Sequence, residues 1–136
     1  MDSDVVIEIS NVWKIFGSKP ELALKAIHER GLTKAEVLAE FNAVVGVADV
    51  SLDVKRGEIF CIMGLSGSGK STLVRHFNRL LEPTAGRIEI QGTDGMALGT
   101  KELHTFRNTK IGMVFQNFAL MPHRSVLDNV AMPLEI

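Results

Sequence analysis

One stretch of eight residues, numbers 64 to 71, constrains the fold of this chain more than any other feature. It reads Gly-Leu-Ser-Gly-Ser-Gly-Lys-Ser and fits the pattern of a glycine, four variable residues, glycine, lysine and serine or threonine. A backbone with so few side chains can curl so that its N–H groups point inward at an anion. A random chain of this length contains the pattern in about one case in two hundred. The stretch therefore predicts a loop that binds the phosphates of a nucleotide.

The chemistry of this loop is divided between its main chain and two side chains. Main-chain N–H groups would bind phosphate oxygens, and the ammonium of Lys70 would reach the β and γ phosphates. The hydroxyl of Ser71 would coordinate the Mg²⁺ ion that accompanies them. The candidate nucleotide-binding residues are Gly64, Leu65, Ser66, Gly67, Ser68, Gly69, Lys70, Ser71 and Thr72.

The residues on either side of the loop support this prediction. Residues 59–63 form an unbroken apolar run, which predicts a strand buried on both faces in a parallel sheet. Leucine and phenylalanine recur at helical spacing between residues 73 and 81, so we expect a helix that starts at Thr72. Strand, glycine loop and helix in this order indicate an α/β fold whose helix N-terminus faces the phosphates. A second apolar run, residues 111–115, predicts another buried strand.

Other segments predict an antiparallel sheet and two surface helices. Partial alternation of apolar and polar residues, rich in β-branched side chains, predicts strands over residues 5–12, 44–54 and 87–91. A polar segment with inward-facing Leu103 and Phe106 predicts a helix over residues 100–110. Ser125 can cap a last helix that runs through about Met132 and stops at Pro133.

The region 18–45 predicts an inserted helical hairpin. One helix spans residues 20–30 and ends at Gly31, and Thr33-Lys34-Ala35-Glu36 is a capping box that opens a second helix to about Phe41. We see no catalytic group in this region, and a role in docking to another subunit stays open. The apolar seam between the helices is expected to contain Leu22, Leu24, Ile27, Leu32, Val37, Leu38 and Phe41.

Two residues outside the loop are further candidates for the site. Gln116 follows the second apolar run, at the edge of a parallel sheet where ligands bind. Its amide could coordinate Mg²⁺ or orient a water near the γ phosphate, or it could simply cap a turn. Phe16 lies in the segment that follows the first predicted strand, and it could pack in the core or, if that strand edge passes near the glycine loop, stack on a purine base.

Composition and charge exclude several classes of protein. The formal net charge is −1 with both signs interspersed, so we expect no nucleic-acid-binding surface. Cys61 is the single cysteine and cannot form an internal disulfide. The N-terminus is acidic and no apolar run approaches the roughly 20 residues that cross a bilayer, so we expect a cytosolic setting. The four histidines are scattered, and we expect no structural metal.

Taken together, these motifs resemble the nucleotide-binding domain of an ABC transporter ATPase over essentially the whole chain. Residues 64–71 match its Walker A motif, Gln116 matches its Q-loop glutamine, and Phe16 falls where the family carries an adenine-stacking aromatic residue. Residues 60–73 and 113–123 are most similar to subunits that energise import of glycine betaine, proline betaine, choline and similar quaternary amines. Those subunits also carry a helical insertion after the aromatic residue.

The resemblance implies a P-loop NTPase fold with ATP and Mg²⁺ as ligands. Phe16 would stack on adenine, residues 64–72 would surround the phosphates, and Ser71 and Gln116 would hold the metal ion. The implied partners are a transmembrane permease and a second copy of the ATPase, at the cytoplasmic face of the bacterial plasma membrane. The transported amine would not contact this chain.

Some parts of the family pattern are absent from this sequence. No apolar run is followed by an Asp-Glu pair, and there is no separate signature motif. We therefore expect residues 1–136 to be the N-terminal part of a longer ATPase that binds ATP but does not hydrolyse it alone. Its pieces would be the insertion (18–45), the strand, phosphate loop and helix (58–81), and the strand with the Q-loop (111–124). Two alternatives stay open, namely a non-catalytic nucleotide-binding or regulatory module complete at Ile136 and a soluble P-loop enzyme.

Overall fold

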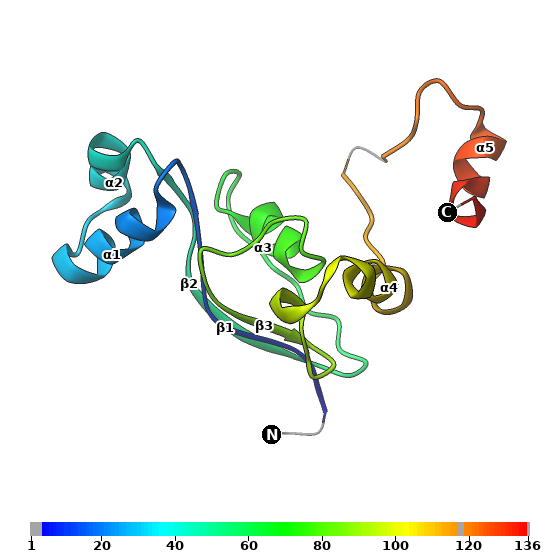
Figure 1. The fold of residues 1–136 in the computed structure, drawn as a ribbon, viewed down its shortest axis with the longest axis horizontal. Helices are drawn as coiled ribbons and strands as arrows, with labels where there is room; N and C mark the ends of the chain where they lie inside the picture. The colour runs from blue at the N-terminus through cyan, green and yellow to red at the C-terminus, as the bar shows by residue number, and fades with distance from the viewer. Residues whose placement is uncertain (1–3, 117–118, 136) are drawn as a thin grey trace.

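The computed structural model describes residues 4–116 and 119–135. At its centre is one sheet of four antiparallel strands in the order β2-β1-β3-β4 (Figure 1). The expected strands over residues 5–12, 44–54 and 87–91 are confirmed, and the first continues to Phe16 because it pairs along its whole length with the second. The strands are β1 (Val5–Phe16), β2 (Val44–Lys55), β3 (Ala85–Ile90) and β4 (Thr93–Asp94).

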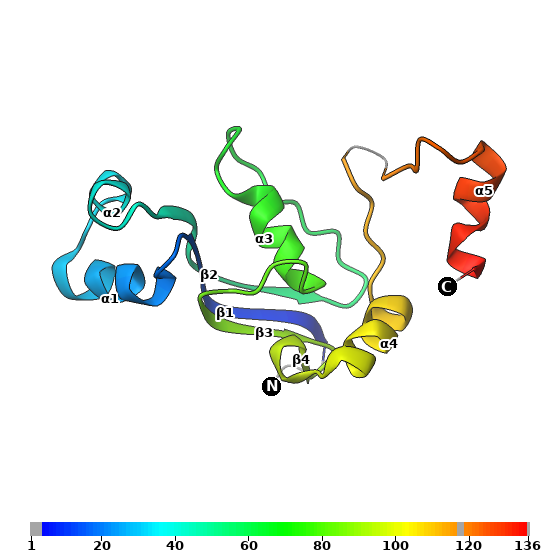
Figure 2. The same ribbon diagram turned by 45° about the horizontal axis from the view of Figure 1, so that its top comes forward.

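The main core lies between this sheet and helix α3 (Lys70–Phe77), which crosses one face of the sheet (Figure 2). The register of β1 shifts between Ile9 and Val12, where Asn11 has a φ of 49°. This bulge lets Ile9 and Val12, three residues apart, point to the same face instead of opposite faces. The buried members of this core are Ile9, Val12, Val47, Leu73, Ile88, Ile90 and Phe106.

The expected helical hairpin is present as α1 (Pro20–Arg30) and α2 (Lys34–Phe41), at one end of the β1–β2 pair (Figure 1). The capping box is confirmed, because the hydroxyl of Thr33 accepts from the N–H of Glu36 and the Glu36 carboxylate accepts from the N–H of Thr33. The seam is correct for five of its seven members. Leu22 and Leu38 are 53% and 51% exposed and face solvent, so their assignment to the seam was wrong.

The two apolar runs expected as strands of a parallel sheet are not strands in this structure. Residues 59–63 and 111–115 lie outside the sheet, and neither is paired with a described strand. A strand requires a neighbour that completes its backbone hydrogen bonds, and neither run has one in the described chain. Ile59 and Val114 are 92% and 97% exposed, whereas the sequence pattern predicted that they would be buried.

Helix α3 is shorter than expected and is shifted towards the loop. It begins at Lys70, not Thr72, and it ends at Phe77, although apolar spacing continues to residue 81. The helix cannot continue because Arg79 is left-handed, with a φ of 54°. The guanidinium of Arg107 donates to the carbonyl oxygens of Asn78 and Arg79 at 2.8 and 2.9 Å, which satisfies acceptors at this helix end.

The remaining helices follow the sheet along the chain. Helix α4 (Thr100–Lys110) is confirmed, and the hydroxyl of Ser125 caps α5 (Val126–Ala131) by accepting from the N–H of Asp128 at 3.1 Å. The predicted stop is confirmed to within a residue, because α5 ends at Ala131 and Pro133 lies in the short 3₁₀ helix that follows it, η2 (Met132–Leu134). A similar helix, η1 (Gly95–Ala97), precedes α4.

Both views show α5 apart from the sheet (Figures 1 and 2). In the described ranges, none of the helices has the length and apolar character needed to span a membrane.

One polar side chain lies inside the core with an incomplete set of partners. His76 of α3 is 3% exposed, and its Nδ1 lies 2.6 Å from the carbonyl oxygen of Thr72. Its Nε2 is buried and has no hydrogen-bond partner in the described structure. Burial lowers the pKa of the His76 imidazole below its ordinary value of 6.5, and the Lys14 cation lowers it further. The ring is therefore neutral at pH 7, and Nδ1 is its donor.

We expect acid to destabilise the fold through His76. The folded-state pKa lies below the unfolded value of about 6.5, so the unfolded chain binds more protons and stability falls as the pH drops through that value. His76→Leu should raise the melting temperature by a few degrees more at about pH 5.5 than at about pH 8. The matched control is His104→Leu on the exposed face of α4. Equal effects of His76→Leu at both pH values would contradict the assignment.

Candidate functional site

The glycine loop takes its shape from two left-handed glycines. Gly67 and Gly69 have φ values of 76° and 93°, a region that side chains disfavour. The N–H of Ser68 donates to the carbonyl oxygen of Leu65 at 3.2 Å and closes a turn, and α3 begins directly afterwards. The first N–H groups of a helix have no partners within the helix. The loop and the start of α3 therefore offer neighbouring donors to an anion.

Lys70 folds back over the loop that precedes it. Its ammonium donates to the carbonyl oxygens of Gly64 and Leu65 at 2.8 and 2.6 Å, and to the hydroxyl of Ser68 at 3.3 Å. These contacts hold the positive charge within the curve of the loop. A triphosphate oxygen arriving there would meet a cation that is already positioned by the main chain.

Gly46 of β2 is the point where the loop meets the sheet. A Cβ placed on Gly69 would stand 2.2 Å from the carbonyl oxygen of Gly46, so the two backbones touch. A Cβ placed on Gly46 would in turn stand 2.6 Å from Cε2 of Phe16, because the Phe16 ring leans across the position that a side chain would fill. Because Gly46 and Gly69 have no side chains, the aromatic ring and the glycine loop can both approach the same segment of β2.

The ring and the loop line a shared cavity. This cavity has a volume of about 290 Å³, and the Phe16 ring on its wall is only partly covered. An aromatic surface at one side and main-chain donors at the other match the two chemically different ends of a nucleotide. The lining residues are Phe16, Val44, Val45, Gly46, Gly67, Ser68, Gly69, Lys70, Ser71 and Thr72.

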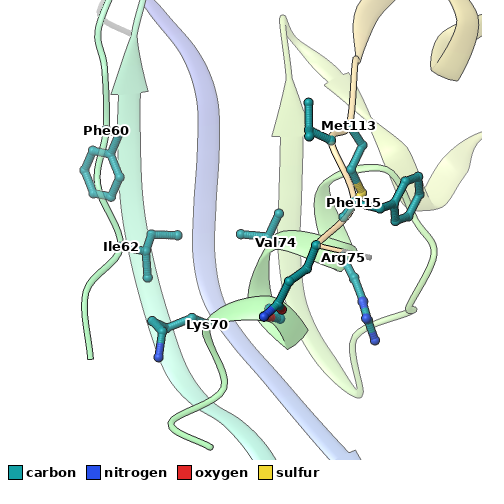
Figure 3. Close-up of a pocket in the computed structure, with 10 residues that line it drawn as sticks. Phe60, Ile62, Lys70, Val74, Arg75, Met113 and Phe115 are labelled. Carbon is teal, nitrogen blue, oxygen red and sulfur yellow. The ribbon is translucent and has the colours of Figure 1, made fainter. Parts of the chain in front are cut away.

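A second cavity of about 340 Å³ adjoins the first at Lys70 and Ser71 and also reaches Gln116. Two of its sides are mainly apolar: Phe60 and Ile62 lie on one side, Met113 and Phe115 on the other, and Val74 of α3 lies between them (Figure 3). Ser71 and Gln116, which carry oxygen atoms in their side chains, also line this space. Oxygen donors of this kind are the ligands that Mg²⁺ prefers.

The structure brings the residues expected at the site into one region, and their roles in binding remain predictions. Sequence reasoning missed Gly46, although a glycine within a strand of β-branched residues is a signal of close backbone approach. Asn117 and Phe118, which belong to the predicted strand and Q-loop segment (111–124), lie outside the described residues. Groups of three or more His, Cys, Asp or Glu side chains able to hold a metal ion do not occur in the part of the chain that the structure describes.

Comparisons with known proteins agree with this geometry. A family model described as "ABC transporter" matches residues 47–135. The glycine betaine/proline betaine transport system ATP-binding protein ProV of Escherichia coli K12 is 52% identical over 132 residues, which cover 97% of this chain and 33% of that protein. The trimethylamine N-oxide transport system ATP-binding protein TmoW of Ruegeria pomeroyi is 55% identical over 131 residues, covering 96% and 38%. The chain thus spans about a third of the length of these relatives.

A solved structure shares the fold. The dimeric, post-hydrolysis form of the ATP-binding cassette MJ0796, bound to ADP and Pi, matches with a TM-score of 0.71 and 32% sequence identity. The match covers 95% of this chain and 47% of that one. The described structure is therefore part of an ABC ATPase cassette, a P-loop NTPase fold, with its antiparallel sheet in place.

Replacement of Gly69 by alanine tests the contact between loop and sheet. Gly69→Ala places a methyl group against the Gly46 carbonyl and forces a left-handed φ on a residue with a side chain. We expect a loss of about 2–4 kcal/mol in the free energy of unfolding, measured by urea denaturation. Gly95→Ala is the control, because a Cβ there meets nothing within 4 Å. Equal stability of the two variants would show that the loop does not pack as described.

Proposed function

We propose that this chain, which belongs to the ABC transporter family, is the nucleotide-binding part of an ATP-binding subunit that energises import of quaternary amines. One observation carries the nucleotide site: the Phe16 ring and the glycine loop meet at Gly46 and line one cavity. An isolated glycine turn would not need an aromatic ring beside it. An aromatic core residue would not be 39% exposed.

In the proposed complex, adenine stacks on Phe16 and the triphosphate lies along the loop. N–H groups between Gly64 and Thr72 bind its oxygens, and Lys70 exchanges its main-chain acceptors for the β and γ phosphates. Ser71 and Gln116 fit a Mg²⁺ ion because both line the second cavity and both carry oxygen donors. Bound Mg²⁺ would supply positive charge that neutralises the phosphates.

The proposed substrate class rests on the relatives. About half of the residues of this chain are identical to those of subunits named for transport of glycine betaine, proline betaine and trimethylamine N-oxide. We propose that the transported compound is a small methylated amine of this kind, and that it binds a transmembrane permease without touching this chain. A second copy of the subunit completes the assembly, as in the dimeric cassette. Its place is the cytoplasmic face of the plasma membrane.

The proposal also accounts for the two exposed apolar runs, residues 59–63 and 111–115. We propose that an apolar strand from the rest of the protein's length lies between them and completes a parallel sheet. Two sides of the second cavity are mainly apolar, and leaving such surface in water costs about 25 cal/mol per Å². The relatives are about three times as long as this chain, which leaves room for that strand.

We further propose that this chain alone binds ATP without hydrolysing it. Phosphoryl transfer depends on a positioned nucleophile and on metal-held charge, for which additional carboxylates are needed. None of the apolar runs in this sequence is followed by an Asp-Glu pair that would provide them. Turnover therefore depends on residues outside these 136.

Replacement of Lys70 tests the nucleotide site. Lys70→Ala removes the cation from the loop, so we expect the dissociation constant for Mg-ATP to rise at least about tenfold, which corresponds to one charge-assisted contact. Isothermal titration of the purified protein at its natural length measures this constant. Lys101→Ala on α4 is the matched control, because it removes an exposed lysine that has no place in the two cavities. Unchanged affinity in Lys70→Ala would refute the assigned role.

Transport assays test the proposed substrate class. Cells without the gene should lose uptake of labelled glycine betaine, and the Lys70→Ala gene should not restore it, because ATP binding drives the permease. Uptake of labelled methionine, a zwitterion of similar size without a quaternary nitrogen, serves as the control. Normal betaine uptake in the deleted strain would contradict the proposal. Failure to co-purify a transmembrane permease would instead favour a soluble P-loop enzyme.

A further inference from the structure

The Phe16 ring has a charged neighbour that the nucleotide site described above does not include. Lys14 precedes it by two residues on β1, so the two side chains lie on the same face of the strand. The ammonium of Lys14 stands over the ring, 5.2 Å from its centroid. This distance lies within the range of a cation–π interaction.

The Lys14 ammonium is also tied to a different part of the fold. It donates to the carbonyl oxygen of Glu82, in the segment that follows α3, at 2.7 Å. A free lysine loses considerable side-chain entropy when it is held over a ring. Here the hydrogen bond to the Glu82 carbonyl offsets part of this entropy loss, because the same side-chain conformation of Lys14 makes both contacts. Lys14 thus links the Phe16 ring to the segment that follows α3 in the sequence.

The two contacts leave one side of the ring for a ligand. Gly46 lies against the Cδ2–Cε2 edge of Phe16, with no room for a side chain between them. The cavity of about 290 Å³ includes Phe16 in its wall, whereas Lys14 is not among the described residues that line it. Lys14 therefore approaches the ring from outside the cavity, and the surface that faces the loop stays open.

We propose that Lys14 is a positioning residue for the base-binding ring, an inference that rests on the proposed function. Contacts with Gly46 and with the Lys14 cation restrict the orientation of the Phe16 ring and leave its cavity side for a purine. A cation on one face also draws π-electron density towards itself, which favours stacking of an electron-rich base on the other face. Lys14 acts through Phe16 and contacts no phosphate.

A direct attraction between Lys14 and the phosphates is the competing explanation. The two roles differ in what they require: positioning needs the aromatic ring and a base, whereas direct attraction needs only the phosphates. The affinities for Mg-ATP and for Mg-tripolyphosphate, each measured with and without the Phe16 ring, therefore distinguish the two roles. Dissociation constants of the protein at its natural length provide the readout.

The variants are Lys14→Met, Phe16→Leu and the combination of both. We expect Lys14→Met to raise the dissociation constant for Mg-ATP about two- to fivefold, the size of one cation–π contact, and to leave that for Mg-tripolyphosphate unchanged. In the Phe16→Leu background the same change should have no further effect. Lys14→Arg should retain the affinity, because a guanidinium can stack on the ring and donate to the Glu82 carbonyl.

Two results would overturn the inference about Lys14 and leave the base site intact. One is an equal loss of Mg-tripolyphosphate affinity in Lys14→Met, and the other is a loss of Mg-ATP affinity that persists without the ring. Phe16→Leu tests the proposed function separately. If it leaves Mg-ATP affinity unchanged, the base does not lie on Phe16, and both proposals fail. Melting temperatures of all variants show whether a loss of affinity reflects loss of folding.

Discussion

The arrangement of this site depends on a main-chain contact between two glycine residues. Gly69 in the loop touches the carbonyl of Gly46 in β2, and the space above Gly46 is taken by the Phe16 ring. Glycine at both positions is a steric requirement, because a single methyl group at either would push the loop or the ring away. The aromatic surface and the phosphate-binding donors are therefore held close together at Gly46.

Much of this arrangement could be predicted from local patterns. The glycine loop, the capping box at Thr33 and the antiparallel strands each depend on residues close in sequence, and local patterns encode them well. The bulge at Asn11 and the contact at Gly46 escaped prediction, because they depend on what lies across the sheet. The end of α3 escaped it too, since the left-handed conformation of Arg79 overrides an apolar spacing that continues to residue 81.

The apolar runs at residues 59–63 and 111–115 show a different limit. Their composition is that of buried parallel strands, yet the described structure leaves Ile59 and Val114 open to solvent. A hydrophobic pattern predicts that a segment will be buried, but the burial itself requires a neighbour. Helix α3 supplies one wall of the space between the runs through Val74, and an additional strand would supply the rest. The same space contains Ser71 and Gln116, so completing the sheet would also enclose the proposed metal site.

A crystal structure of the protein at its natural length with Mg²⁺ and a non-hydrolysable ATP analogue tests the central claim most directly. The account predicts that the triphosphate lies within hydrogen-bond distance of the main-chain N–H groups between Gly64 and Thr72, with the adenine ring stacked on Phe16. Nucleotide density at another surface, or a base directed away from Phe16 while the phosphates lie in the loop, would contradict it.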